Sequence, residues 1–167
     1  MTDEGVGNGL PTVWNVPARL ARFVGRRAEL GRVAAALATR GAAAVCKVHG
    51  AAGVGKTVLA IEYAHQHKDD FDVVWWVPAH DPALIGGHVA ALGAQLGLGE
   101  GADWPAVAAA LRSRNWRWLL VLDDVEDSSV AAPFRPSNPL GRLLVTTRQA
   151  RLDIVGSAVK LAEFDPQ

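Results

Sequence analysis

The sequence predicts an α/β protein built on a parallel β-sheet. Segments of strand character alternate with segments of helix character along the 167 residues, the pattern of a parallel sheet with right-handed crossovers. Residues 73–77 are continuously apolar and rich in β-forming types, as expected of a strand buried on both faces. A glycine-rich segment, residues 50–57, separates a strand candidate from a helix candidate.

Each expected element has its own local signal. Apolar residues at helical spacing predict the first helix, Gly41 ends it, and Pro105 suits the first turn of a later helix. The expected strands are residues 42–48, 73–77, 118–122, 142–147 and 158–161. The expected helices are residues 28–39, 58–67, 83–96 and 104–114, with a short helix near Ser129. We expect residues 1–16 to be a flexible leader and residues 17–167 to form one nucleotide-binding domain of P-loop type.

Composition limits the function classes. Lysine plus arginine and aspartate plus glutamate number 17 each, so no net charge favours direct nucleic-acid or membrane binding. No apolar run approaches the roughly 20 residues that span a bilayer, and the acidic N-terminus lacks secretory features. A cytoplasmic location follows by default. The single cysteine, Cys46, is expected to be a buried core thiol.

Residues 50–57 fit the phosphate-binding pattern G-x-x-x-x-G-K-[ST]. Glycines allow backbone N–H groups to approach phosphate oxygens, and the following helix directs its positive end at them. Lys56 is expected to reach the β- and γ-phosphates, and the Thr57 hydroxyl to bind Mg²⁺. The expected nucleotide-binding residues here are Gly50, Gly53, Val54, Gly55, Lys56, Thr57 and Val58.

Two carboxylates follow the apolar strand 118–122. Asp123 is the expected Mg²⁺ anchor, acting directly on the ion or at one remove from it. Asp124 is a candidate for orienting or deprotonating the attacking water. A neighbouring carboxylate can also simply shape a site, and Glu126 competes for this assignment.

A polar group at the end of the strand 142–147 faces the ligand crevice of an open α/β sheet. Arg148 is therefore expected to touch the γ-phosphate, the alternative being a solvated arginine at a strand end. The five histidines show no metal-ligand spacing with the cysteine.

Four motifs in order make the chain resemble the NB-ARC branch of the STAND-type P-loop NTPases. They are Phe23-Val24-Gly25-Arg26, the phosphate loop, Leu119 to Asp124, and Leu144 to Arg148. Asn15-Val16-Pro17-Ala18-Arg19 and Val74-Trp75-Trp76-Val77 are similar to actinobacterial members that carry tetratricopeptide repeats.

The resemblance implies a three-layer fold with strand order 5-1-4-3-2, Mg²⁺-dependent ADP/ATP binding, and adenine near Val24, Gly25 and Arg26. It makes Arg148 a sensor arginine and implies slow or negligible hydrolysis, a weak ATPase at most. Ala52 replaces one glycine of the usual loop pair, and Arg27 replaces an acidic residue.

The family continues into a small helical domain and a winged helix, which this sequence does not reach. We therefore expect nucleotide binding without switching, with other domains of a longer STAND protein or a partner protein completing the switch; oligomer formation is left open. The alternatives are a self-contained P-loop ATPase or small-molecule kinase, and a nucleotide-independent interaction module.

Overall fold

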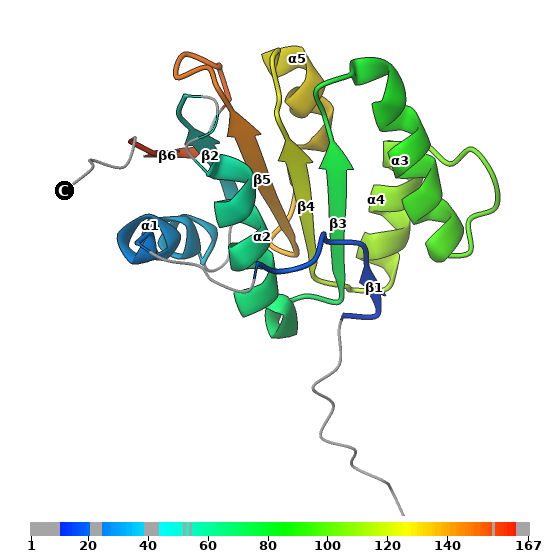
Figure 1. Cartoon of the computed structure of the whole chain (residues 1–167). Helices are drawn as coiled ribbons and strands as arrows, with labels where there is room; N and C mark the ends of the chain where they lie inside the picture. The colour runs from blue at the N-terminus through cyan, green and yellow to red at the C-terminus, as the bar shows by residue number, and fades with distance from the viewer. Residues whose placement is uncertain are drawn as a thin grey trace, which may run out of the picture.

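The computed structural model describes residues 11–20, 25–38, 44–51, 53, 55–154 and 156–162. Within these residues, a six-stranded parallel sheet carries helices on both faces (Figure 1). The strands are β1 (Val13–Trp14), β2 (Ala44–His49), β3 (Val73–Pro78), β4 (Trp118–Asp123), β5 (Gly141–Thr147) and β6 (Ser157–Lys160). The main helices are α1 (Arg27–Leu37), α2 (Lys56–Gln66), α3 (Pro82–Gln95) and α4 (Trp104–Ser113), followed by the short α5 (Ser128–Ala131).

The strands lie side by side in the order β1-β3-β4-β5-β2-β6, and every neighbouring pair is parallel. Counted from β2, this is the expected order 5-1-4-3-2 with β1 added beside β3. The predicted three-layer α/β fold is therefore confirmed. Because β2, β4 and β5 are central, the loops that follow them meet at one end of the sheet.

Two apolar clusters separate the layers. One packs α1 and α2 against one face of the sheet, and contains Cys46 and Val48 from β2. The other packs α3, α4 and α5 against the opposite face and contains Leu120 and Leu122 from β4. Burial raises the pKa of the Cys46 thiol to about 12, so this cysteine is the inert core residue that was expected.

Aspartates begin three helices. The side chains of Asp81, Asp103 and Asp127 accept backbone N–H groups at the starts of α3, α4 and α5, which satisfies donors that a helix start leaves open. In the described part of the chain, no helix has both the length and the apolar character needed to cross a bilayer.

The end of the expected leader is ordered, so that prediction is wrong from Val13 onward. Val13 is 5% exposed and pairs with Val73 of β3. The Asn15 side chain both donates to the carbonyl and accepts from the N–H of Trp76. Arg19 pairs with Glu62 of α2, with Nε donating to Oε2 at 2.9 Å. These contacts tie the segment to β3 and to α2; residues 1–10 lie outside the described residues.

Candidate functional site

The glycine-rich loop joins β2 to α2 at the carboxyl end of the sheet. Gly53 and Gly55 have φ angles of +79° and +97°, a backbone region that side chains disfavour and glycine adopts freely. Gly55 is the residue that precedes the first turn of α2. The loop glycines are thus required by backbone conformation, and they leave the N–H groups at the helix start facing the loop.

Lys56 is the first residue of α2 and is 8% exposed. Its Nζ donates to the carbonyl oxygens of Gly50 at 2.8 Å and Ala51 at 2.6 Å. Burial lowers the pKa of Lys56, and the positive charge of Arg148 acts in the same direction while Asp124 opposes both. Among the described residues, the partly desolvated ammonium bonds to neutral oxygens of its own loop, which makes it a ready partner for an anion.

Asp123 ends β4 and joins three segments. Its Oδ1 accepts a hydrogen bond from Thr57 Oγ1 of α2 at 2.8 Å and from Thr146 Oγ1 of β5 at 2.6 Å. A hydroxyl that donates its proton keeps lone pairs for a cation. Hydroxyl and carboxylate oxygens fit Mg²⁺, which commonly binds one or two protein oxygens and fills its remaining positions with water and phosphate. Thr57 and Asp123 would hold that ion.

Asp124 follows directly and has a φ of 65°, a left-handed conformation that aspartate tolerates better than most residues. Its N–H donates to Thr146 Oγ1 at 2.8 Å. The residue lines the same cavity as Lys56. Its carboxylate is thus placed beside the phosphate loop, whereas the predicted role on water stays a prediction.

Arg148 lies just after β5 and lines this cavity. Its Nη2 donates to Glu126 Oε1 at 3.2 Å, and both side chains are more than half exposed. Glu126 therefore pairs with Arg148 in this structure, and its competition with Asp124 for the role on water stays a prediction. An exposed pair of this kind contributes little to stability, so Arg148 can leave Glu126 for another anion at little cost.

The cavity has a volume of about 480 Å³ and brings most of the predicted residues together. Its lining consists of Gly53, Gly55, Lys56, Thr57, Val58, Asp123, Asp124, Thr146 and Arg148. Thr146 was not assigned a role from the sequence. The signal in the sequence was its place at the end of an apolar strand, because a buried polar side chain needs a hydrogen-bond partner. In the structure Thr146 is 1% exposed.

The residues expected near adenine are not part of this lining. Arg26 is 6% exposed at the start of α1, and its Nη2 donates to the carbonyl of Ala162 at 2.7 Å. Gly25 precedes it with a φ of 81°. Val24 and Val54 lie outside the described residues. The adenine assignment therefore remains a prediction.

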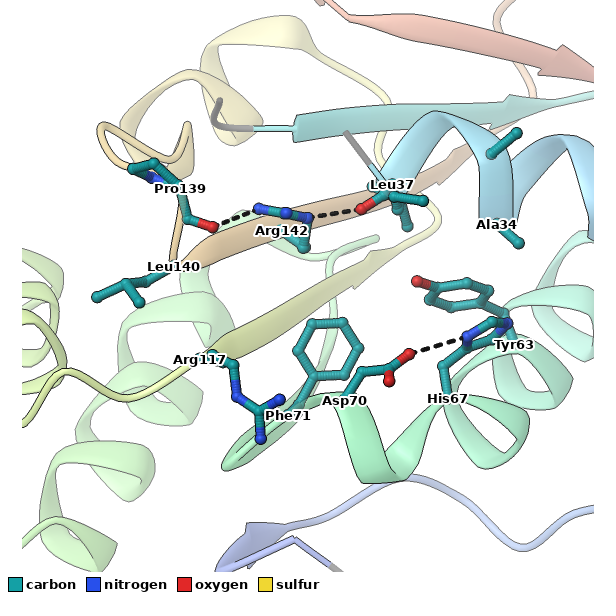
Figure 2. A pocket seen from close by; sticks show the side chains of 12 residues that line it. Ala34, Leu37, Tyr63, His67, Asp70, Phe71, Arg117, Pro139, Leu140 and Arg142 are labelled. Atoms are coloured by element: carbon teal, nitrogen blue, oxygen red, sulfur yellow. Dashed lines mark hydrogen bonds and ion pairs between the residues drawn. The ribbon is translucent and has the colours of Figure 1, made fainter. Parts of the chain in front are cut away.

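A second cavity, of about 440 Å³, lies at the opposite end of the sheet (Figure 2). Three of its polar side chains already have partners: His67 Nδ1 lies 3.1 Å from Asp70 Oδ2, and Arg142 donates to the carbonyls of Leu37 and Pro139. Residues 39–43, which follow this wall, lie outside the described residues. The phosphate-loop cavity is the better candidate site.

Comparison with protein families matches residues 26–163 to the NB-ARC domain. The chain belongs to the NB-ARC family. Two curated relatives of this NB-ARC chain are named Regulatory protein AfsR. The one from Streptomyces griseus is 31% identical over 154 residues, and the one from Streptomyces coelicolor is 30% identical over 159 residues. Each comparison covers 85% of this chain and 16% of the relative.

The NB-ARC fold has a solved structural neighbour in Cdc6p from Pyrobaculum aerophilum. The TM-score is 0.64 at 17% sequence identity, over 89% of this chain and 47% of the neighbour. At that identity the likeness concerns the fold alone. It agrees with the three-layer sheet, while the regulatory relatives are much longer proteins than the part matched here.

Proposed function

We propose that this chain is the ADP/ATP-binding core of a STAND-type signalling switch, with Mg²⁺-dependent binding and slow or negligible ATP hydrolysis. The observation that carries the proposal is the 2.8 Å hydrogen bond between Thr57 and Asp123 beside the buried Lys56. A hydroxyl, a carboxylate and a lysine that converge after a glycine loop supply a cation site next to a phosphate site.

The proposed roles follow from position. Backbone N–H groups of the loop and Lys56 would hold the phosphates, and Thr57 with Asp123 would hold Mg²⁺, which when bound neutralises phosphate charge. Arg148, at the cavity rim, would exchange Glu126 for the γ-phosphate. Asp124 would orient or deprotonate the attacking water, to a degree that keeps ATP hydrolysis slow or negligible. Gly25 would meet the base through its backbone, because the Arg26 side chain is engaged with Ala162.

The regulatory part of the proposal is supported by the relatives. Both are named regulatory proteins, and the matched region is 16% of their length. We infer that this domain works in the cytoplasm together with other domains or with a partner protein. A nucleotide-dependent contact such as that of Arg148 would report the γ-phosphate to them.

Equilibrium binding and turnover measured on one preparation test the proposal. We expect ADP and ATP to bind in the presence of Mg²⁺, GTP to bind more weakly, and Thr57→Val to lose the Mg²⁺ dependence that Thr57→Ser keeps. Turnover should fall far below about 1 s⁻¹, the lower end for kinases. Turnover at or above that rate would favour a self-contained ATPase or kinase, and equal affinity for GTP would contradict the adenine assignment.

A further inference from the structure

Lys47 is a buried charge within the sheet. It lies on β2, the strand that leads into the phosphate loop, and is 8% exposed. In the described part of the chain it forms no ion pair. Burying an ammonium group is costly unless hydrogen bonds replace its water, so the contacts that Lys47 makes have to offset this cost.

The hydrogen bonds that Lys47 forms with described residues go to the segment that follows Arg148. Lys47 Nζ donates to the carbonyl oxygen of Ala150 at 2.8 Å and to that of Leu152 at 3.1 Å. Hydrogen bonds from a charged donor are stronger than neutral ones. Because side chains alternate along a strand, Lys47 shares the face of β2 with Val45, against the cluster that contains Leu152.

Arg148 is thereby held from both sides. On one side, Thr147 is fully buried and its Oγ1 donates to the carbonyl of Val125. On the other side, Gln149 N–H donates to Thr147 Oγ1, and Ala150 accepts from Lys47. The Arg148 side chain itself remains half exposed, and within the described residues it forms an ion pair with Glu126. Its position therefore depends on the backbone that carries it.

We propose that Lys47 is a positioning residue for Arg148 and sets the preference of the site for ATP over ADP. The proposal rests on the proposed function, since it takes Arg148 to be the γ-phosphate contact. One ammonium group links the strand that presents the phosphate loop to the loop that presents Arg148. Lys47 thus fixes the phosphate loop and Arg148 relative to each other. Affinity for ATP gains from this, because its γ-phosphate reaches Arg148, whereas ADP lacks that phosphate.

The test compares Mg²⁺-ATP and Mg²⁺-ADP affinities in Lys47→Met, which keeps an unbranched apolar chain of nearly the same length and removes the donors. If the freed loop presents Arg148 correctly about a tenth of the time, ATP affinity falls about tenfold, and ADP affinity stays within about twofold. Lys47→Gln, which is too short to reach both carbonyls, should behave alike and serves if the methionine variant does not fold. Lys160→Met is the control, because Lys160 is an exposed lysine on neighbouring β6.

A double-mutant cycle with Arg148→Ala shows whether Lys47 acts through that arginine. We expect the double variant to bind ATP no more weakly than Arg148→Ala alone, because residues in one chain of contacts are not additive. Additive losses, or equal losses for ADP and ATP, would overturn the proposal.

The hydrogen-exchange rates of the Leu152 and Ile154 amides distinguish a failure of this proposal from a failure of the proposed function. Both amides bond within the Lys47-anchored segment, and their exchange should accelerate in Lys47→Met without nucleotide. Unchanged exchange overturns the anchoring itself. If the wild-type protein binds neither nucleotide while exchange still accelerates in Lys47→Met, the proposed function is overturned and Lys47 remains an anchor of the loop.

Discussion

At the residue scale, the site depends on one carboxylate oxygen. Asp123 Oδ1 accepts from Thr57 and from Thr146, so α2, β4 and β5 converge on it. Thr146 also accepts the Asp124 N–H, which fixes the left-handed residue next to the anchor. This network orients the carboxylate before any cation or phosphate arrives, and that lowers the ordering cost of binding.

The first prediction concerns Thr146→Val, which keeps the shape and removes the hydroxyl. The Asp124 N–H then lacks its acceptor and Asp123 loses a donor, which should lower the free energy of unfolding by about 1–3 kcal/mol. Thr146→Ser should recover most of this loss. Urea denaturation of the two variants measures it, and equal stability of valine and wild-type proteins would contradict the network.

The second prediction concerns the pair Arg19 and Glu62. Glu62 is 3% exposed, so removing its partner in Arg19→Met leaves a buried carboxylate whose remaining hydrogen bond among the described residues comes from Gln66. Because Arg19 itself is half exposed, we expect a loss of about 1–2 kcal/mol in unfolding free energy. Adding Glu62→Gln should restore part of it, since the buried charge is gone.

The same pair gives a pH dependence. The hydrogen bond from Arg19 is the main cause that lowers the pKa of Glu62 below its ordinary 4.5. A lowered carboxyl pKa stabilises the fold fully above the unfolded-state value and loses that contribution as pH falls through the folded-state value. Wild-type and Arg19→Met stabilities should therefore differ at pH 7 and converge below pH 4.5; a constant difference would contradict the assignment.

Local motifs explain how much of the site the sequence could predict. Lys56 and Thr57 have fixed spacing from the loop glycines, and Asp123 ends an apolar strand, so these residues could be placed in advance. Thr146 could not, because its partner depends on the β4–β5 register, in which Leu122 lies opposite Val145. Lys47 likewise bonds to carbonyls more than 100 residues away in sequence.

At the element scale, the residues that start helices and the continuous apolar runs of strands made these elements predictable from the sequence. Pro82 and Asp81 start α3, and apolar runs define β3 and β4. The exception is β1, because two residues are too few for any periodic pattern. Its position comes from side-chain contacts such as that of Asn15 with Trp76, which only the folded chain shows.

Two glycines of α3 give a prediction at this scale. A Cβ at Gly93 would lie 2.6 Å from the Cβ of Ala102, whereas a Cβ at Gly87 meets nothing within 4 Å. Gly93→Ala should destabilise the fold by about 1–3 kcal/mol through overpacking. Gly87→Ala, its matched control, should stabilise by about 0.5–1 kcal/mol through helix propensity. Thermal melting that gives both variants the same sign would contradict this packing of α3.

At the scale of the whole molecule, the two ends of the sheet differ in what they offer a ligand. The strand order places the loops after β2, β4 and β5 together at the carboxyl end, where Lys56 and Arg148 line one cavity. At the amino end, His67 and Arg142 are already bonded to neighbouring groups (Figure 2). The carboxyl end of the sheet, at the glycine loop, is therefore where we expect an anionic ligand to bind.

The most direct test of the account is the melting temperature with millimolar Mg²⁺-ADP or Mg²⁺-ATP, for wild type and for Lys56→Ala. A ligand at about 100 times its Kd adds roughly 2.7 kcal/mol to the unfolding free energy, or about 5–10 °C for a domain of this size. We predict that rise in the wild type, its loss in Lys56→Ala, and its reduction by EDTA. A wild-type melting temperature that does not move with either nucleotide would contradict the account.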